Sequence, residues 1–299
     1  MSMTNVKEIQ ISQYNYDLPE GRIAKYPLNK RENSKLLLYG QDEDIKHTTF
    51  SGLNQHLPAN SLLIFNNTKV VHARFHFYKQ TGAKIEIFCL EPIFPVDYQA
   101  VFNSKKSCRW KCLIGNLKKW KDDTLSQDIR IARKTTTLSV SKAGKDSDTL
   151  IIDFYWDNEK ITFGEIMAYA GTIPIPPYLQ RESESIDSLR YQTVYSKLEG
   201  SVAAPTAGLH FTKNLLEELT RYGHKTTEIT LHIGAGTFKP VNHQSIGEHE
   251  MHTEYFEFSK DFIQKLIQHK GSIVAVGTTT LRTIESIYQA GLKIIENKD

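Results

Sequence analysis

Hydrophobic and polar positions alternate through the middle of the chain, between residues 85 and 156. The strand-like runs are residues 84–88, 110–114, 137–140 and 149–154. A period of two is typical of β-strands that bury one face, and no helical period appears in this region. Consecutive short strands with polar or glycine-containing turns predict a small antiparallel barrel or sandwich, because full or partial closure protects the strand edges.

Further along the chain the period of the apolar positions becomes helical. Leu215, Leu216 and Leu219 form an apolar stripe on a helix that is predicted to end at Gly223. An alternating strand is predicted next, over residues 227–233. The change of period marks the end of the β region.

A second helix is predicted after Ser259, whose hydroxyl can cap the first turn. Its core face should contain Phe262, Leu266 and Ile267, and Gly271 should end it. The next predicted elements are the apolar strand 272–276, the segment Gly277-Thr278-Thr279-Thr280 and a helix that continues to Gly291.

This alternation of helices and strands predicts an α/β domain with at least partly parallel strands. The first part of the chain also contains strand-like runs, at residues 61–65 and 69–77. We therefore expect a discontinuous α/β domain with a mixed sheet, formed by residues 1–74 and 159–299, that carries the active site. A small antiparallel β-barrel domain, residues 75–158, should be inserted into it.

Composition narrows the class of protein without identifying it. The 299 residues are enough for two domains, and 24% charged and 39% apolar residues are typical of folded proteins rather than disordered chains. A formal net charge of +3 permits contact with a polyanion but is far from the charge of a histone-like protein.

The cysteines and the N-terminus indicate the compartment. Cys89, Cys108 and Cys112 form neither an even disulfide set nor a CxxC zinc pair, which favours a reducing environment. The polar segment 1–13 lacks the apolar core of a secretory signal, and no run approaches the ~20 apolar residues that span a bilayer. We expect a cytoplasmic protein that makes no membrane contact.

The segment 277–282 lies where an apolar strand is predicted to meet a helix. Backbone N–H groups at a helix N-terminus, together with Arg282, can bind an anion. The alternative is structural: Thr278 caps the helix, and Arg282 is solvated or pairs with Glu285 at helical spacing.

His232 and a glycine-rich segment follow the predicted strand 227–233. Gly234 and Gly236 would let a ligand approach the backbone closely. The spacing resembles the dinucleotide motif GxGxxG only superficially, because the third glycine is missing and no helix obviously follows. A tight structural turn is the alternative.

The segment 249–254 contains His249, His252 and Glu254. A zinc-binding HExxH motif would need its second histidine where this chain has Thr253, so that motif is excluded. On a strand, His252 and Glu254 would project from one face, and a histidine–carboxylate pair is suited to acid–base catalysis. The alternatives are a surface histidine cluster and an unrelated metal-dependent hydrolase that uses these three side chains.

A loop of small residues, 203–211, carries His210 as its one ionisable side chain and precedes the first predicted helix. It could admit a ligand, or His210 could simply pack beside Phe211. Upstream, three prolines within residues 173–178 predict a stiff, extended segment that suits either a linker or a pocket wall.

Together these segments resemble the family of S-adenosylmethionine:tRNA ribosyltransferase-isomerases, which are enzymes of queuosine biosynthesis. The number of matching motifs and their order argue against chance agreement. The matching segments are 16–31 with Ser34, 65–70 with Ala73-Arg74, 174–178, 191–195, 202–211, 231–241, 251–254 and 276–286.

The resemblance implies a reaction on tRNA. The family's enzymes transfer the ribosyl moiety of S-adenosylmethionine to 7-aminomethyl-7-deazaguanine at the wobble position and isomerise it, which gives epoxyqueuosine-tRNA, adenine and methionine. S-adenosylmethionine is then a cosubstrate, and no cofactor or metal is expected. The resemblance also implies an inserted β-barrel beside an α/β domain, and we expect a monomer.

This chemistry needs a base that removes the ribose C5′ proton beside the sulfonium and an acid that protonates the departing adenine. Among the acid–base groups of the matching motifs, we expect His252 and Glu254 to form a proton-handling pair, with His210 as a third catalytic candidate. The residues expected to bind cosubstrate or phosphate are His232, Gly234, Gly236, Thr237, Thr278, Thr279 and Arg282.

Two departures from the family pattern change these expectations. Thr172 stands where the family usually has a histidine, so a role for that histidine is not transferred to this chain. The sequence ends at Asp299, whereas the family continues through an Asn-Phe-His-Leu-Pro segment and a final apolar helix. We therefore expect a truncated or shortened form, and the alternative function is a catalytically incompetent form that only binds tRNA.

Overall fold

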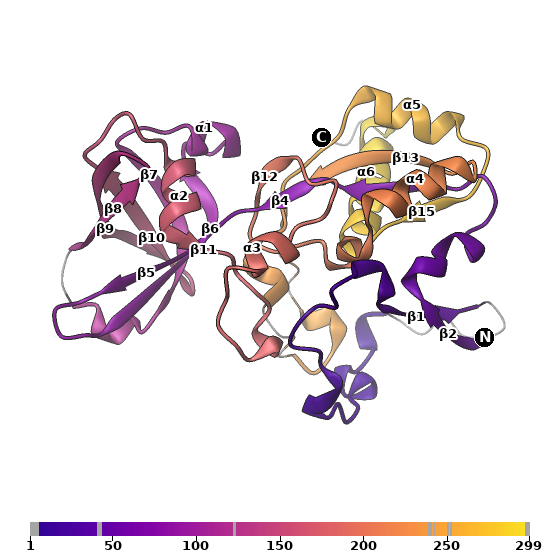
Figure 1. The fold of residues 1–299 in the computed structure, drawn as a ribbon, viewed down its shortest axis with the longest axis horizontal. Coiled ribbons are helices and arrows are strands. Elements are labelled where there is room, and N and C mark those ends of the chain that lie inside the picture. The colour runs from indigo at the N-terminus through magenta and orange to yellow at the C-terminus, as the bar shows by residue number, and fades with distance from the viewer. Residues whose placement is uncertain are drawn as a thin grey trace.

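The computed structural model describes residues 6–40, 44–121, 124–238, 241, 243–249, 251 and 253–296. The chain has a mixed α/β fold with several sheets, and one of them is a curled antiparallel half-barrel. In Figure 1 the half-barrel lies at the left, and the parallel strands with their helices lie at the right. No helix in these ranges is both long and apolar enough to cross a membrane.

The half-barrel is a seven-stranded sheet with the order β11-β5-β6-β7-β10-β9-β8. Its strands are β5 (Arg74–Tyr78), β6 (Lys84–Phe94), β7 (Ser107–Gly115), β8 (Thr124–Ile131), β9 (Lys134–Asp146), β10 (Thr149–Trp156) and β11 (Gly171–Thr172). The four runs predicted from alternation lie within β6, β7, β9 and β10, which confirms them. No pairing joins the two ends of this order among the described strands, so the curled sheet stays open.

Aromatic side chains fill the half-barrel. Phe75, Trp110, Phe154 and Phe163 are fully buried, and the rings of Phe154 and Phe163 meet edge to face with centroids 5.2 Å apart. Alternate strand residues point inward, which is why a period-two sequence supplies this core. The helices that pack on the sheet are α1 (Tyr98–Phe102) and α2 (Phe163–Ala170).

A four-stranded mixed sheet forms the centre of the α/β part, with the order β14-β13-β3-β15. The central strand β3 pairs in parallel with β13 and β15, and β14 pairs antiparallel with β13. The parallel strands predicted from the sequence are therefore confirmed. The bounds are β3 (Leu62–Asn66), β13 (Lys225–Leu231), β14 (Phe256–Glu257) and β15 (Ile273–Ala275).

Helices cover both faces of this sheet, and β3 is buried along its whole length. Successive strand residues point to opposite faces. Leu63 and Phe65 accordingly pack against α4, whereas Leu62 and Ile64 pack against α5 and α6. The three helices are α4 (Lys213–Arg221), α5 (Lys260–Gln268) and α6 (Thr278–Ile295).

The prediction for α5 is confirmed at its start and wrong for one core residue. Ser259 caps the helix, since its hydroxyl oxygen accepts a hydrogen bond from the Phe262 N–H at 3.0 Å. Phe262 is buried and Leu266 packs beside it, as predicted. Ile267 is instead 72% exposed. It follows Leu266 directly and is therefore rotated by about 100° away from the buried stripe.

Several element ends also differ from the prediction. α5 ends at Gln268 rather than at Gly271, and α6 continues through Gly291 to Ile295. A glycine inside a helix costs only about 1 kcal/mol, which the packing of the apolar face of α6 offsets. The run predicted as one strand over 69–77 is divided into β4 (Thr68–Val70) and β5, and the strand predicted over 227–233 ends at Leu231.

The other described elements belong to neither of these two sheets. β1 pairs antiparallel with β2, and β12 pairs in parallel with β4. These strands and the helix α3 are β1 (Lys35–Tyr39), β2 (Ile45–Thr49), β12 (Leu198–Ser201) and α3 (Asp187–Arg190). Short 3-10 helices are η1 (Val6–Glu8), η2 (Ile11–Tyr14), η3 (Glu20–Arg22), η4 (Arg31–Asn33), η5 (Phe50–Gln55), η6 (Leu117–Lys119), η7 (Pro177–Leu179), η8 (Thr206–His210), η9 (Ala235–Phe238) and η10 (Ile246–Glu248).

Candidate active site

The parallel strands of the α/β sheet end on the same edge, and that edge carries most of the predicted site residues. β3 ends at Asn66, β13 leads into His232 and Gly234, and β15 leads towards Gly277 and α6. In open α/β sheets, ligands bind in the crevice outside the carboxyl ends of the strands. This edge is therefore the candidate active site.

Two buried polar side chains fix the backbone that leaves β13. Oδ1 of Asn66 accepts a hydrogen bond from the Leu231 N–H at 3.0 Å, and its Nδ2 donates to the Leu231 carbonyl at 3.0 Å. Oγ of Ser201 accepts a hydrogen bond from the Ile233 N–H at 2.8 Å. Buried polar groups that are satisfied in this way hold the following segment in one conformation.

Glu254 joins two predicted binding elements. Its Oε1 accepts a hydrogen bond from the Gly234 N–H at 3.0 Å, and its Oε2 lies 3.0 Å from Nη1 of Arg282. The Glu254 side chain is only 5% exposed, whereas that of Arg282 is 36% exposed. Three predicted site residues thus lie in contact, and the buried carboxylate holds the guanidinium at the edge of the site. Helical spacing in the sequence suggests Glu285 as the partner of Arg282, whereas the structure places Glu254 there.

His232 directly precedes the glycine-rich segment in the sequence, and its ring is stacked on aromatic rings. Its imidazole lies 4.4 Å from the ring of Tyr98 at an interplanar angle of 14°, and 5.9 Å from the ring of Tyr255 at 20°. Burial lowers its pKa to about 4, so the ring is neutral at physiological pH. Nδ1 has no hydrogen-bond partner among the described residues.

Gly200 is the reason why His232 fits there. Gly200 has φ +149°, and a Cβ atom on it would stand 2.1 Å from Nδ1 of His232. Only a residue without a side chain allows this close approach. Tyr98 comes from α1 of the half-barrel, so the imidazole is enclosed by elements of both parts of the molecule.

The N-terminus of α6 meets the loop of small residues. Gly277 is the N-cap, with φ 93° and no side chain to satisfy the first N–H groups of the helix. Because the N-cap position is Gly277, Thr278 does not cap the helix; Thr278 is exposed and Thr279 is half-buried. The Ala207 methyl lies 3.5 Å from the position that a Cβ on Gly277 would take. No side chain caps these helix N–H groups within the described residues, which suits an anion.

His210 lies at the end of η8, in an aromatic cluster. Its ring centroid is 5.3 Å from that of Phe50, and burial lowers its pKa. The backbone before it is held by Arg31, whose Nη1 donates to the Leu209 carbonyl at 3.2 Å. No contact of His210 with Glu254 is found among the described residues.

The remaining predicted site residues lie in η9 or outside the described residues. Gly236 is half-buried and Thr237 is exposed, both within η9. His252 lies outside the described residues. No group of three or more metal-binding side chains is found in the part of the chain that is described, and Glu250 also lies outside it.

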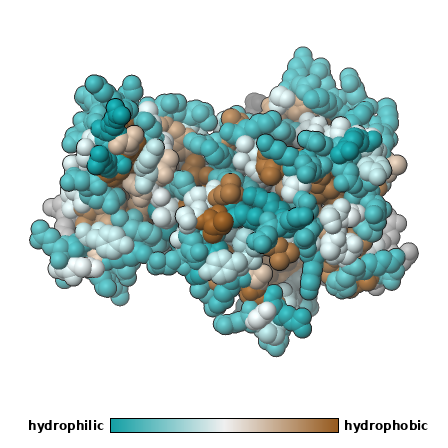
Figure 2. Space-filling view, viewed as in Figure 1, coloured by the Kyte–Doolittle hydropathy of each residue, from teal (hydrophilic) through white to brown (hydrophobic). Residues whose placement is uncertain are grey.

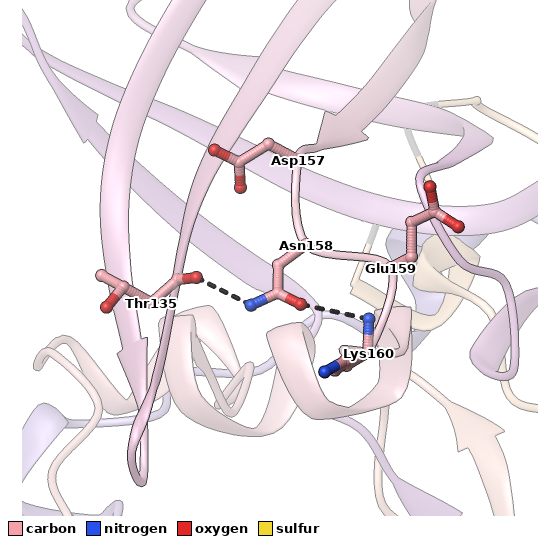
Figure 3. A pocket seen from close by; sticks show the side chains of 5 residues that line it. All are labelled: Thr135, Asp157, Asn158, Glu159 and Lys160. Atoms are coloured by element: carbon pink, nitrogen blue, oxygen red, sulfur yellow. Dashed lines mark hydrogen bonds between the residues drawn. The ribbon is translucent and has the colours of Figure 1, made fainter.

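Two cavities are lined by other residues. One, of about 700 Å³, is formed at the turn after β10 and is shown in Figure 3. There Nδ2 of Asn158 donates to the Thr135 carbonyl at 3.0 Å, and its Oδ1 accepts from the Lys160 N–H at 3.1 Å, so the amide is used to hold the turn. The other, of about 560 Å³, lies beside β13 and the start of α5. Neither is lined by a predicted site residue.

Comparison with known proteins decides the family. A family model described as "Queuosine biosynthesis protein" matches residues 11–298. The chain belongs to this family. The resemblance stated from the sequence motifs is therefore confirmed.

Relatives in the queuosine biosynthesis family are more than a third identical to this chain over the aligned residues. The S-adenosylmethionine:tRNA ribosyltransferase-isomerase of Trichlorobacter lovleyi is 36% identical over 279 residues, which are 92% of this chain and 76% of the relative. The protein of that name from Sulfurimonas denitrificans is 39% identical over 283 residues, 93% of this chain and 76% of the relative. The solved S-adenosylmethionine tRNA ribosyltransferase of Thermotoga maritima aligns at 26% identity with a TM-score of 0.39, covering 92% of this chain and 73% of that chain.

Some residues of the family motifs hold the fold together. The Gln192 side chain accepts a hydrogen bond from the Val70 N–H at 3.0 Å and donates one to the Val70 carbonyl at 2.7 Å. A Cβ on Gly208 would stand 1.8 Å from the Tyr195 hydroxyl oxygen, so this glycine allows close packing. Matching motifs therefore contain structural as well as candidate chemical residues.

Tyr98 and Gly200 were not predicted from the sequence as residues of the site. Tyr98 lies in the half-barrel, and nothing in its neighbourhood along the chain indicates that its ring would meet His232. Gly200 offered a usable signal, because a glycine beside a run of small residues is typical of close packing.

Proposed function

We propose that this chain is an S-adenosylmethionine:tRNA ribosyltransferase-isomerase. It transfers the ribosyl moiety of S-adenosylmethionine to 7-aminomethyl-7-deazaguanine at the wobble position of tRNA and isomerises it, and the products are epoxyqueuosine-tRNA, adenine and methionine. The observation that carries the proposal is the family match over residues 11–298, with relatives of this name at 36% and 39% identity.

The reaction is assigned to the carboxyl edge of β3, β13 and β15. An anionic group of the substrates, either the carboxylate of S-adenosylmethionine or a tRNA phosphate, suits Arg282 and the N–H groups of Thr278 and Thr279 at the start of α6. The turn that contains Gly234, Gly236 and Thr237 is linked to Arg282 through Glu254, which supports a binding role for both.

Proton transfer is assigned to His252 with Glu254 as its carboxylate partner, and His210 is the third candidate. A base must take the ribose C5′ proton and an acid must protonate adenine. Glu254 has a second role in this scheme. Because it accepts hydrogen bonds from Gly234 and Arg282, it also positions the anion-binding side chain. We assign His232 to substrate binding, as a neutral ring next to the glycine-rich turn in the sequence.

We also propose bounds for the two domains and partners for this chain. The proposed arrangement is a discontinuous α/β domain of residues 1–74 and 159–299 with a β-barrel domain of residues 75–158 inserted. β5 and β10 lie at the ends of the inserted range, and α2 and β11, which follow it, also pack on the half-barrel or pair with it. S-adenosylmethionine acts as cosubstrate without a further cofactor. The protein works as a cytoplasmic monomer on tRNA.

Release of adenine tests the function. Purified protein is incubated with S-adenosylmethionine and tRNA that carries 7-aminomethyl-7-deazaguanine, and free adenine is measured by chromatography. Adenine should appear with this tRNA and not with the same tRNA carrying guanine. Tight tRNA binding without any adenine would instead identify a form that only binds tRNA.

A further inference from the structure

Positive charge is concentrated in the half-barrel. Residues 74–156 contain 15 lysines and arginines against 9 aspartates and glutamates, a net charge of +6, whereas the whole chain has only +3. The rest of the chain is therefore net negative by three charges. A partner with a polyanionic surface would be attracted to the half-barrel rather than to the α/β part. Hydrophilic side chains dominate the face of the half-barrel seen in Figure 2.

One end of the half-barrel carries a group of lysines around η6, after the end of β7. Trp120 is 2% exposed and anchors this segment in the core. With that ring buried, the flanking Lys118, Lys119 and Lys121 are exposed. Asn116 fixes the turn in front of them, since it adopts φ 59° and its Nδ2 donates to the Lys84 carbonyl at 2.9 Å.

A lysine of a neighbouring strand joins this group. Nζ of Lys142, on β9, donates to the Trp120 carbonyl at 3.3 Å and lies 5.2 Å above the Trp120 ring. We call Lys118, Lys119, Lys121 and Lys142 the η6 lysine cluster. None of its members forms an ion pair with a carboxylate within the described ranges. The next residues in the sequence, Asp122 and Asp123, leave the cluster with a net charge of +2.

We propose that the η6 lysine cluster binds the phosphate backbone of the tRNA substrate; this inference rests on the proposed function. The α/β edge takes one base, so the remainder of the anticodon arm must lie outside it. The half-barrel extends to the side of the α/β part in Figure 1 and carries the excess positive charge. Lysines bind phosphates as point charges and read no sequence, so the cluster contributes affinity and orientation but not base recognition.

Charge removal tests the cluster directly. The variant Lys118→Gln/Lys119→Gln/Lys121→Gln is compared with Lys105→Gln/Arg133→Gln/Lys160→Gln. The control removes the same charge from exposed positions that precede β7, join β8 to β9 and follow β10, at the opposite end of the strands. Fluorescence anisotropy measures the Kd for tRNA between about 50 and 200 mM salt, the range over which phosphate contacts dominate. Unchanged thermal unfolding of both variants excludes a folding defect.

The cluster variant should bind tRNA roughly tenfold more weakly at low salt, and the slope of log Kd against log salt should fall by about one for each lysine that contacts a phosphate. The KM for S-adenosylmethionine and kcat at saturating tRNA should stay unchanged. Equal salt slopes for wild type, cluster variant and control would overturn the inference. Because binding is measured without turnover, a protein that binds tRNA through the cluster but releases no adenine contradicts the proposed function and not this surface.

Discussion

The carboxylate of Glu254 lies 3.0 Å from the guanidinium of Arg282, and the two side chains differ sharply in burial, at 5% and 36% exposed. Glu254 lies just before β14, and Arg282 lies in the first turns of α6. Since the other carboxylate oxygen accepts the Gly234 N–H, the pair connects a backbone turn with a helix. This contact gives the carboxyl edge of the sheet a defined shape.

The unequal burial predicts unequal effects of mutation. Arg282→Met should lower the free energy of unfolding by about 2 to 4 kcal/mol, because it removes the Arg282 cation from the buried Glu254 carboxylate. Glu254→Gln should cost only about 1 to 2 kcal/mol, because water can solvate the half-exposed Arg282 and the amide oxygen can still accept from Gly234. Urea denaturation of both variants measures the difference. Equal losses would mean that the ion pair does not control the stability of this edge.

The stack of Tyr98 on His232 should depend on the ring and not on the hydroxyl. Tyr98→Ala should lower the free energy of unfolding by about 2 to 4 kcal/mol and raise the KM for S-adenosylmethionine, because the His232 imidazole loses its stacking partner. Tyr98→Phe keeps the ring and should stay within about 0.5 kcal/mol of wild type. Thermal unfolding and initial rates check this. A phenylalanine variant as damaged as the alanine variant would assign the effect to the hydroxyl.

The low pKa of His232 predicts a pH dependence of stability. The pKa of His232 is about 4 in the folded chain, whereas that of an ordinary histidine side chain is 6.5. Between these two pH values the imidazole is therefore protonated in the unfolded chain and neutral in the folded chain. The contribution of His232 to the free energy of unfolding is fully present above pH 6.5. It is lost as the pH falls from 6.5 to 4, by roughly 3 kcal/mol in total. His232→Phe keeps a flat ring and should remove this part of the slope. Chemical denaturation at several pH values, with His47→Gln as control, tests it; identical slopes for wild type and His232→Phe would contradict it.

Gly200 and Gly223 form a matched pair for testing close packing. Both have positive φ, but a Cβ on Gly200 would stand 2.1 Å from His232 Nδ1, whereas a Cβ on Gly223 meets nothing within 4 Å. Gly223→Ala should cost about 1 kcal/mol through backbone strain alone. Gly200→Ala should cost at least about 3 kcal/mol, because the imidazole must also move. Similar melting temperatures for the two variants would show that His232 has room to shift.

Local patterns predicted the elements well, and they predicted contacts between elements poorly. Alternation identified β6, β7, β9 and β10, and Ser259 marked the start of α5, because period and capping are properties of neighbouring residues. Ile267 was misassigned because an apolar residue beside a stripe has the same hydropathy as one within it. Ends such as Gly291 depend on packing along the whole helix, which no local signal contains.

The same difference between local patterns and contacts between elements applies to the candidate site. The sequence marked Gly234, Glu254 and Arg282 as separate candidates, and folding brings them into contact. Tyr98 escaped notice because its role depends on how α1 meets the end of β13, a contact between segments far apart in the sequence. Family resemblance linked the motifs, and the sheet edge gives the physical reason why they belong together.

The most direct test of the account is the nucleoside composition of tRNA after the reaction. Substrate tRNA is incubated with the protein and S-adenosylmethionine, digested and analysed by mass spectrometry, while adenine is quantified in the same sample. One epoxyqueuosine should form for each adenine released, and no reaction should occur in the absence of S-adenosylmethionine. A tRNA whose deazaguanine base is unchanged in mass, with no adenine formed, would contradict it.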